Sequence, residues 1–443
     1  MLTLSCSTSY AGWSVEIAGG KRHMELRDDE KAMLDGKEGP AVRKAMELLV
    51  RYGDALGAER LVDTNNTAGV FGGFGPALRT MSEEEIFYEF SLDSREVGTI
   101  PEVKAFSCHL ETPMDPIHWE EQGVSREAYE SNRRSRITAA RMGLQLLNTC
   151  APYLAGNVPV MGEHCAWMES SAVVYCNSVI GARTNTEGRE SSTAAMLTGK
   201  IPYWGYHIDE NRWATRLVDV DFDVRTTFDW GLLGYYVGEL VQEHVPVLNG
   251  ISRQPGLPQL KHFGAAAASS GGVEMYHIAG ITPEARTVAE AIGQNKIEDH
   301  ITFGERERRA AYEMLNLSNK ETDVDFVMLG CPHYSIDQVW HACRLLSGKK
   351  VKTNLWIFAP NAVKELADRN GYTEIIKQAG GVLMTDTCPC LGRVYPKGTR
   401  IVAVDSAKQA HYLPAILGFP AWFGTQEDCI NAAVSGKWQG ELR

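Results

Sequence analysis

The clearest pattern of apolar and polar positions lies in the last third of the chain, where short apolar runs alternate with amphipathic stretches. The runs DVDFVMLG, KTNLWIFA, GGVLMTD and RIVAVD predict four strands, because each is bounded by polar or glycine positions. The amphipathic stretches predict helices, with Ser335 and Thr425 as N-caps and with one helix that begins at Pro360 and ends at Gly371. This alternation predicts βα units on a mainly parallel sheet.

Earlier in the chain the pattern is less regular. AVRKAMELLVRYGDALG carries apolar residues at helical spacing and predicts a helix, and LVDTNNTAGVFGGFGPALRT predicts a strand that ends in a glycine-rich loop. Residues 94–135 are polar and irregular, which predicts a surface insertion or lid. We therefore expect an N-terminal extension over 1–40, a catalytic region over 41–300 and a C-terminal βα lobe over 301–443.

Composition narrows the class of protein. The chain has 443 residues, of which 44% are hydrophobic and 23% charged, as in soluble globular proteins with several lobes. A net charge of −12 disfavours nucleic-acid binding, which needs a basic surface. Neither a targeting segment nor an apolar run of the ~20 residues needed to span a bilayer is visible, so we expect a soluble, cytoplasmic protein.

The candidate chemistry lies where predicted strands end, because ligands of open α/β sheets bind beyond the carboxyl ends of the strands. Cys331 and Cys388 each follow a predicted strand, Ser406 and Lys408 follow another, and Cys150 follows the apolar segment LQLLN. Each of the three cysteines has a proline one or two positions later, which can begin a helix. A helix N-terminus there would lower the pKa of the thiol and favour metal binding.

Three thiolates from separate loops suit an iron or iron–sulfur site with one open coordination position. Zinc more often uses pairs of cysteines separated by two residues. Two other interpretations stay open at this point. In one, the cysteines are buried structural residues, and in the other, one of them is a nucleophile paired with His164, His333 or His411.

The stretch GEHCAWMESSAVVYCNSVIGARTNTEGRESSTAAMLTGK holds the densest set of polar residues in the chain. Its serine pairs, in ESSA and ESST, predict helix starts whose backbone N–H groups could bind a carboxylate or a phosphate. The other interpretation is that these serines only cap helices and that Arg183 forms a structural ion pair. The candidate residues in this stretch are His164, Ser170, Ser171, Arg183 and Asn185.

Several stretches together resemble the catalytic part of the aconitase X family, a branch of the aconitase superfamily. They are GEHCAWMESSAVVYCNSVIGARTNTEG, SSGGVEMYHIAGITPEA, LGCPHYS, TDTCPCLG and VDSAKQAHYLP, and the resemblance extends from about Ala41 to Trp438. The resemblance implies an aconitase-like α/β fold, with several lobes of mainly parallel sheet flanked by helices around a central cleft. It also implies an iron-dependent hydro-lyase.

The resemblance extends to single residues. It implies that Cys150, Cys331 and Cys388 hold an iron–sulfur cluster or a mononuclear iron. Cys390 matches no ligand of the family, so we expect a packed thiol that Pro389 directs away from Cys388.

Substrate contacts are implied in the loop TNNTAGVF, at the serine pair of ESSA and at the lysine of VDSAK. The expected catalytic residues are His164, Ser170 and Lys408. The expected substrate-binding residues are Asn66, Gly69, Val70, Phe71, Ser170, Ser171, Arg183, Asn185 and Lys408.

Members of the family dehydrate either cis-3-hydroxy-L-proline or 5-phosphomevalonate. Phe71 stands where relatives that act on phosphomevalonate carry a small hydroxylic residue, and an aromatic ring offers no hydrogen bond to a phosphate. The insertion over 94–135 also departs from the compact archaeal form. We therefore expect β-elimination of water from cis-3-hydroxy-L-proline to give Δ1-pyrroline-2-carboxylate, with 5-phosphomevalonate as the alternative substrate. A binding subunit without a cluster is the alternative of another class.

A partner is implied as well. In the superfamily, a swivelling small domain supplies the catalytic serine. The resemblance to the catalytic part takes up nearly all of this chain, so it implies a separate small subunit that carries the serine. The other interpretation is that a residue of this chain acts as the base.

Overall fold

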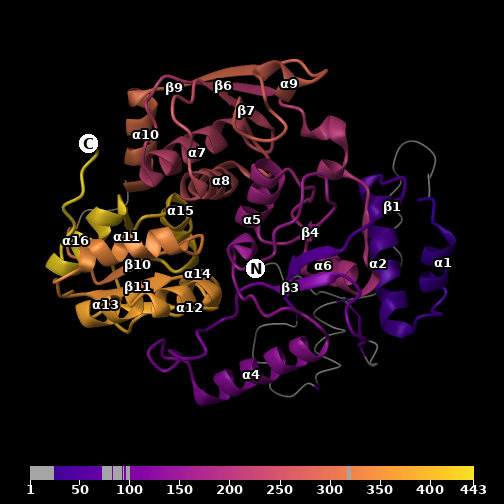
Figure 1. Cartoon of the computed structure of the whole chain (residues 1–443), viewed down its shortest axis with the longest axis horizontal. Coiled ribbons are helices and arrows are strands. Elements are labelled where there is room, and N and C mark those ends of the chain that lie inside the picture. The colour runs from indigo at the N-terminus through magenta and orange to yellow at the C-terminus, as the bar shows by residue number, and fades with distance from the viewer. Residues whose placement is uncertain (1–23, 72–81, 83–91, 93, 96–99, 317–320) are drawn as a thin grey trace, which may run out of the picture.

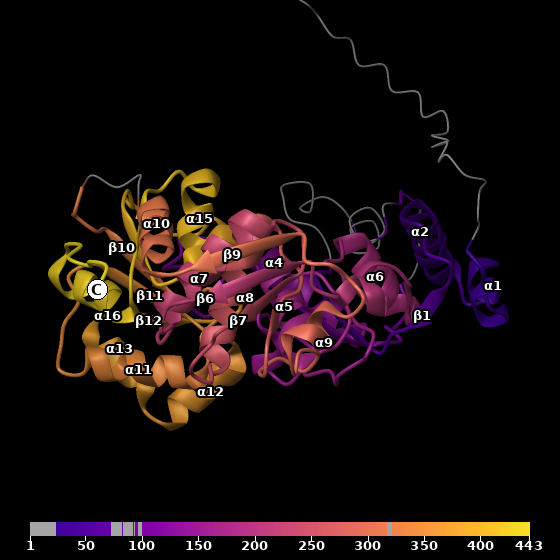
Figure 2. The ribbon, with the colours of Figure 1, turned by 90° about the horizontal axis from the view of Figure 1, so that it is seen from above.

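A computed structural model shows three lobes around a common centre (Figure 1). In Figure 1 the N-terminal elements lie on one side, the middle of the chain lies at the top and the C-terminal elements lie on the other side; seen from above, the middle of the chain lies between the other two parts (Figure 2). The described residues are 24–71, 82, 92, 94–95, 100–316 and 321–443. Within this part of the chain, no helix is both long and apolar enough to cross a membrane.

The C-terminal lobe is built on a five-stranded parallel sheet in the order β12-β11-β10-β13-β14. Its strands are β10 (Phe326–Leu329), β11 (Asn354–Phe358), β12 (Val382–Met384), β13 (Val402–Val404) and β14 (Ala421–Phe423). The four predicted strands are present, and β14 joins them at one edge. The predicted βα architecture is therefore confirmed in this lobe.

The helices expected at Ser335 and Thr425 begin where the sequence predicts, because these residues cap them. The helices of this lobe are α11 (Ile336–Leu346), α12 (Asn361–Arg369), α13 (Tyr372–Ala379), α14 (Pro389–Gly392), α15 (Ala407–Ile416) and α16 (Gln426–Ser435). Ser335 and Thr425 are N-caps, and the Thr425 hydroxyl accepts the backbone N–H of Asp428 at 3.1 Å. One element was missed: α13 begins directly after Gly371, where only the end of a helix was expected.

The middle lobe has a second parallel sheet, of four strands in the order β8-β7-β6-β9. Its elements are β6 (Arg216–Val220), α7 (Thr227–Val241), β7 (Pro246–Asn249), α8 (Leu257–Gly271), β8 (His277–Ile278), α9 (Val288–Ile292), β9 (Asp299–Phe303) and α10 (Glu305–Asn316). The backbones of α7 and α8 are in contact, since an added Cβ at Gly238 would lie 2.5 Å from the carbonyl oxygen of Ala267. This close packing fixes α8 against the C-terminal lobe, where Lys261 donates to the loop after β10.

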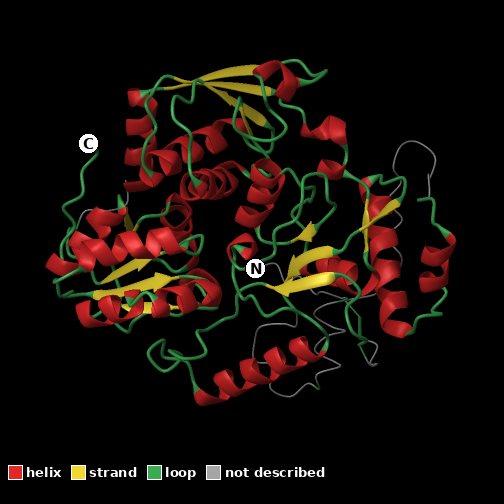
Figure 3. Cartoon of the chain, viewed as in Figure 1, coloured by secondary structure: helices red, strands yellow, loops and turns green. Residues whose placement is uncertain are grey.

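Alternate residues of β10 explain why the five-stranded sheet carries helices on both faces. Val327 and Leu329 belong to one apolar cluster, with α11, α12, α13 and α16. Phe326 and Met328 belong to the opposite cluster, with α7, α10 and α15. Both faces of the sheet are therefore buried, and Figure 3 shows helices on either side of it.

The N-terminal lobe has a three-stranded parallel sheet, β3-β2-β4, and an antiparallel pair, β1-β5. Its strands are β1 (Leu61–Asp63), β2 (Asn66–Gly69), β3 (Phe106–His109), β4 (Ala166–Trp167) and β5 (Lys200–Pro202). Its helices are α1 (Asp28–Leu34), α2 (Pro40–Leu56), α4 (Arg126–Arg141), α5 (Ser170–Tyr175) and α6 (Arg189–Thr198). The predicted amphipathic helix is α2, and α1 packs against it within the segment expected to be an extension.

The expectation of an irregular segment over 94–135 is corrected by the structure. Its described residues contain β3 and the first part of α4, and β3 pairs in parallel with β2. Ser107 and Cys108 are buried in this strand. The pattern did not show the strand because it is only four residues long and its partners lie far along the chain. The roles as insertion or lid and the expected domain boundaries stay predictions, and residues 1–23 and 72–81 lie outside the described residues.

The loops at the carboxyl ends of two parallel sheets meet between the N-terminal and C-terminal lobes. The strands that end at this junction come from both sheets. They are β2 (ending at Gly69), β3 (His109), β4 (Trp167), β10 (Leu329), β12 (Met384) and β13 (Val404). Two contacts join the loops: the Thr112 backbone N–H donates to the Asp386 carbonyl oxygen at 2.6 Å, and Lys408 Nζ donates to Glu169 Oε1 at 2.5 Å. A site between two such edges is therefore built into the topology.

Candidate metal and substrate site

Three loops at this junction carry the predicted metal ligands. Cys331 lies two residues after β10, and Cys388 is the N-cap of α14, where its Sγ accepts the Leu391 backbone N–H at 3.4 Å. Cys150 comes from the N-terminal lobe, just before the short helix η2 (Pro152–Leu154). Burial raises the pKa of both Cys150 and Cys388, and a nearby thiolate at Cys331 adds to each rise. The structure thus brings the three predicted cysteines together.

Burial, and not a helix start, sets the pKa values of these thiols. Burial raises the pKa of Cys331 to about 12 and the pKa values of Cys150 and Cys388 well above the usual range. The prediction that helix starts lower these pKa values is wrong, because α14 and η2 are short and the thiols are shielded from water. A bound metal cation would favour the thiolates, and three soft donors in one buried place fit a thiophilic metal such as iron.

Cys390 lies beside this group. It is partly buried and packs against the apolar cluster of β13 and α15, as expected for a packed thiol. Burial raises its pKa to about 11, and a thiolate at Cys390 would in turn add to the raised pKa values of Cys331 and Cys388. Its exclusion from the metal ligands therefore stays a prediction.

His333 lies at the centre of the cysteine group, but both of its ring nitrogens are occupied. Ligand-type atoms of Glu111, Cys150 and His333 lie within 4.8 Å of one another. Nδ1 of His333 lies 2.9 Å from Thr149 Oγ1, and Nε2 lies 3.0 Å from the carbonyl oxygen of Thr387. A carbonyl oxygen only accepts, so Nε2 carries the hydrogen, and burial lowers the pKa of His333 to about 4. We infer that this neutral, fully bonded ring is neither a metal ligand nor a base.

The other histidines considered as partners of a cysteine nucleophile bond elsewhere. His164 Nδ1 lies 2.9 Å from Nδ1 of His207, and His411 Nδ1 lies 3.1 Å from the hydroxyl of Tyr235. Within the described residues, no cysteine thiol is hydrogen-bonded to the ring of His164, His333 or His411. The geometry therefore does not support a cysteine–histidine nucleophile.

Lys408 joins the C-terminal lobe to the N-terminal lobe at this site. Its Nζ donates to Glu169 Oε1 at 2.5 Å, to Ser171 Oγ at 2.6 Å and more weakly to Ser170 Oγ at 3.4 Å. Burial opposes the charge of Lys408, but the carboxylate of Glu169 outweighs burial and holds the lysine pKa above its usual range. Lys408 is therefore an ammonium group that can bind an anion, and it cannot accept a proton.

Two carboxylates complete the site, and the sequence analysis gave neither of them a role. Glu169 is the N-cap of α5, and its carboxylate accepts the Ala172 backbone N–H at 2.9 Å. Glu111 lies just beyond β3 and is 7% exposed; burial raises its pKa to about 7, and Glu169 adds to the rise. A position just after a strand is the signal that pointed to Lys408. The same signal would have pointed to Glu111, but β3 lies in the segment that was expected to be irregular.

The loop expected to contact substrate is largely used by the fold. Asn66 Nδ2 donates to Asn157 Oδ1 at 2.7 Å, and Asn66 Oδ1 accepts from Trp167 Nε1 at 2.9 Å. At Gly69, an added Cβ would lie 2.5 Å from Ser192 Oγ, so α6 packs directly on this glycine. Both polar atoms of the Asn66 side chain are therefore engaged within the protein.

Val70 and Phe71 are buried, at 7% and 5% exposed. The Phe71 ring belongs to an apolar cluster with Ala139, Met142 and Met196. Because the ring fills space in this core, its bulk no longer gives a reason to exclude a phosphate from the substrate. Phe71 therefore does not discriminate between phosphomevalonate and cis-3-hydroxy-L-proline.

His164, Arg183 and Asn185 form a separate group around the short helix η4 (Gly205–His207). Asn185 Oδ1 accepts a backbone N–H of η4 at 2.8 Å, and Arg183 donates to the last carbonyl oxygen of η4 at 3.0 Å. Arg183 also forms an ion pair with Asp209, so its interpretation as part of a structural ion pair is confirmed. Within the described ranges, no hydrogen bond or ion pair joins this group to the lysine and carboxylates of the site.

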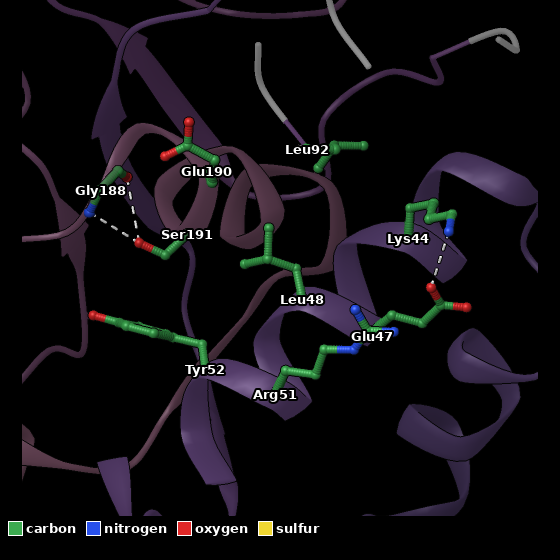
Figure 4. Close-up of a pocket in the computed structure, with 9 residues that line it drawn as sticks. All are labelled: Lys44, Glu47, Leu48, Arg51, Tyr52, Leu92, Gly188, Glu190 and Ser191. Atoms are coloured by element: carbon green, nitrogen blue, oxygen red, sulfur yellow. Dashed lines mark hydrogen bonds and ion pairs between the residues drawn. The ribbon is translucent and has the colours of Figure 1, made fainter. Parts of the chain in front are cut away.

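A cavity of about 640 Å³ lies between α2 and the start of α6 (Figure 4). It is lined by Lys44, Glu47, Leu48, Arg51, Tyr52, Leu92, Gly188, Glu190 and Ser191. None of the candidate site residues lines it, and Lys44 and Glu47 on its wall form an ion pair at 3.3 Å. We therefore place the chemistry at the cysteine and lysine group and not in this cavity.

Glu187 gives a testable pH dependence beside this cavity. It is buried next to Ser191 and Tyr52, and burial raises its pKa from 4.5 to about 7. A carboxyl group whose pKa is raised on folding favours the folded state while it is protonated. Its contribution to stability is therefore fully present below the unfolded pKa of 4.5 and is lost as the pH rises through the folded pKa of about 7. We expect Glu187→Gln to stabilise the protein by about 2 kcal/mol more at pH 8.5 than at pH 5. Thermal unfolding at the two pH values measures this, with the more exposed Glu190→Gln as control. An equal effect of Glu187→Gln at both pH values would contradict it.

The fold and the site define an α/β enzyme with a candidate metal centre between two lobes. Family models of the first, second and third domains of aconitase X match residues 23–210, 214–313 and 324–435. The chain belongs to the aconitase X family.

The chain is similar in sequence to relatives that are named as two different dehydratases. The phosphomevalonate dehydratase large subunit of Methanocaldococcus jannaschii is 37% identical, over 92% of this chain and 100% of its own length. The cis-3-hydroxy-L-proline dehydratase of Hypocrea jecorina is 32% identical, over 95% of this chain and 70% of its own length. The crystal structure of Thermococcus kodakaraensis aconitase X in its holo-form has a TM-score of 0.79 at 35% identity, over 93% of this chain and 100% of that one. The predicted family and fold class are therefore confirmed.

Proposed function

We propose that the chain is the large, iron-binding subunit of a hydro-lyase that removes water from a β-hydroxy carboxylate. The relatives are dehydratases, which supports the reaction class. The observation that carries the proposal is the placement of a largely buried ammonium group, Lys408, beside three cysteines, and the charge of Lys408 partly offsets the rise that burial causes in the pKa of Cys331. One group suits the carboxylate of the substrate and the other suits a metal.

Dehydration of a β-hydroxy carboxylate poses two chemical problems. The proton next to the carboxylate is weakly acidic, and hydroxide is a poor leaving group. An iron centre held by Cys150, Cys331 and Cys388 would supply a Lewis acid for the departing hydroxyl group. Lys408 would bind the carboxylate of the substrate and stabilise the negative charge that develops there when the proton leaves.

The residues around Lys408 set how a carboxylate would bind. Lys408 Nζ donates two short hydrogen bonds, to Glu169 and Ser171. Its third hydrogen bond, to Ser170 Oγ at 3.4 Å, is weak. A substrate carboxylate would take over this third donor while the Ser170 hydroxyl turns to donate to it. We keep Gly69 and Val70 as proposed backbone contacts.

Five residues leave the proposed substrate contacts and catalytic set. Asn66 and Asn185 use their amides to hold other segments, and His164 and Arg183 bond within the group around η4. Phe71 also leaves the set, because its ring is in the core. We propose that these side chains shape the lobe that carries the site.

The proposed substrate is cis-3-hydroxy-L-proline, because of the charges around Lys408. An amino acid carries an ammonium group next to its carboxylate, and the carboxyl groups of Glu111 and Glu169 lie next to Lys408. Lys408 would pair with the carboxylate of the amino acid, and a neighbouring carboxylate of the protein would pair with its ammonium group. The second candidate is 5-phosphomevalonate, also a β-hydroxy carboxylate, which is favoured by the names of relatives that are 37% and 39% identical.

We propose a separate small subunit as the partner that supplies the catalytic serine. Support comes from relatives named large subunits, which the chain matches over 96% or more of their length. The two cis-3-hydroxy-L-proline dehydratases are matched over only 70% of theirs. Since Lys408 and His333 cannot accept a proton in these surroundings, a base from a partner also fits the site.

The test is an anaerobic turnover assay with the small subunit supplied. We expect a brown, iron-containing protein that converts cis-3-hydroxy-L-proline and not 5-phosphomevalonate, followed by proton NMR of the substrate. Turnover of 5-phosphomevalonate alone would replace the substrate and keep the reaction class. A folded, colourless and iron-free protein that converts neither compound would contradict the proposal and favour a binding subunit without a cluster.

A further inference from the structure

Two of the cysteine loops share a sequence and a conformation. Asn148-Thr149-Cys150 and Asp386-Thr387-Cys388 both read as an Asn or Asp, a threonine and the cysteine. Asn148 and Asp386 both have a positive φ, of 46° and 67°, which is rare for residues other than glycine. Asn148 Nδ2 donates to Asp386 Oδ2 at 3.2 Å, so the two bent residues are bonded to each other.

The third cysteine loop joins these two through His333. Its ring bonds to Thr149 Oγ1 at 2.9 Å on one side and to the Thr387 carbonyl oxygen at 3.0 Å on the other. Its backbone N–H donates to Cys150 Sγ at 3.3 Å. His333 lies two residues after Cys331 and is 0% exposed, so one buried ring touches the loops of all three cysteines.

The middle lobe holds the His333 segment in place. Lys261, on α8, donates its Nζ hydrogens to the His333 carbonyl oxygen at 2.6 Å, to Gln338 Oε1 at 2.7 Å and to the Pro332 carbonyl oxygen at 3.2 Å. Lys261 is only 1% exposed, and all three acceptors lie in or just after the Cys331 loop. Each of the three lobes therefore contributes a residue to one hydrogen-bonded assembly around the cysteines.

We propose that His333 is a positioning residue for the metal centre. It holds the loops of Cys150, Cys331 and Cys388 in the ligating arrangement before a metal binds, and Lys261 anchors it. The positive φ of Asn148 and Asp386 turns each loop toward the cysteine that follows two residues later, and the bonds to His333 hold both turned loops. The inference rests on the proposed metal site but not on turnover.

The test is cobalt(II) binding by the full-length, iron-free chain under reducing, anaerobic conditions. We expect the wild type to show a sulfur-to-cobalt charge-transfer band. We expect His333→Phe to weaken cobalt binding about 10- to 100-fold, the usual effect of losing a residue that orients a ligand. His333→Gln keeps one donor and one acceptor, and we expect it to recover part of the affinity.

The control is His277→Phe, which also removes a buried imidazole, one bonded to the Arg212 carbonyl oxygen at 2.7 Å in the middle lobe. We expect it to leave cobalt affinity unchanged. If His333→Phe does not fold, Thr149→Val keeps the imidazole but removes the bond from Thr149 Oγ1 to Nδ1, together with the bond that Thr149 Oγ1 accepts from the Ala151 backbone N–H at 3.1 Å, and it is expected to weaken cobalt about tenfold.

Wild-type affinity and spectrum in both His333→Phe and Thr149→Val would overturn the positioning role while leaving the metal site intact. A different outcome tests the site itself. If wild type shows no charge-transfer band, or if replacing Cys331 by serine leaves the band unchanged, the three-cysteine site fails, and the positioning role fails with it.

Discussion

Replacing Cys388 with alanine is expected to remove iron and turnover together, whereas Cys390→Ala is expected to keep both. Cys388 is the N-cap of α14, and its raised pKa reflects burial of the thiol first and then the charges of Glu111, Cys390 and Cys331. Loss of one of three thiolates leaves a metal site with too few soft donors. A Lewis acid is worth several kcal/mol in such a reaction, so kcat should fall about 1,000-fold or more.

Cys390→Ala is a demanding control because Cys390 lies only two positions away. It is a thiol of the same loop, it is partly buried, and it packs on the apolar cluster of β13 and α15. Iron per chain, the visible spectrum and the initial rate are measured for both variants. Iron and turnover retained in Cys388→Ala would exclude Cys388 as a ligand. Iron lost from Cys390→Ala would instead make Cys390 a ligand.

Lys408→Met is expected to lower kcat/KM about 100- to 1,000-fold, because it removes the cation proposed to bind the substrate carboxylate. The single change also leaves the carboxylate of Glu169, whose side chain is only 16% exposed, without its ion-pair partner, which costs up to about 3–5 kcal/mol of stability. A loss of activity alone would therefore not separate binding from folding.

The double variant Lys408→Met with Glu169→Gln separates the two effects. It replaces the buried ion pair by neutral groups of similar shape, and stability should return toward the wild type. Turnover should stay low, since no cation faces the substrate. Thermal unfolding and steady-state kinetics are measured for the single and double variants. Near-normal kcat/KM in the double variant would contradict the carboxylate-binding role of Lys408.

The C-terminal lobe could be read from the sequence because its signals are local. Apolar runs bounded by polar positions mark β10 to β13, and the side chains of Ser335 and Thr425 mark helix starts. The topology of a parallel sheet then places the loops after its strands at one edge. Local pattern and this rule were sufficient to select Cys331, Cys388 and Lys408, and the resemblance to the family agreed with them.

The N-terminal lobe was predicted less well because its order comes from distant partners. β3 is a strand only because β2 lies beside it, and Glu111 enters the site only because of β3. The polar residues of the stretch around Arg183 look alike in sequence. The fold divides them into Glu169 and the two serines, which face Lys408, and a group that only supports η4.

The sequence by itself determined the family, the parallel sheet of the C-terminal lobe, and which cysteines and which lysine to test. Only the tertiary structure decided the state of these groups. Burial has a larger effect than any helix start and raises the pKa of the thiols. The carboxylate of Glu169 keeps Lys408 charged. Hydrogen bonds to Thr149 and Thr387 make His333 a neutral ring that joins two loops. The physical reason is that pKa values and free hydrogen-bonding capacity depend on surroundings assembled from all three lobes, and no local pattern in the chain encodes them.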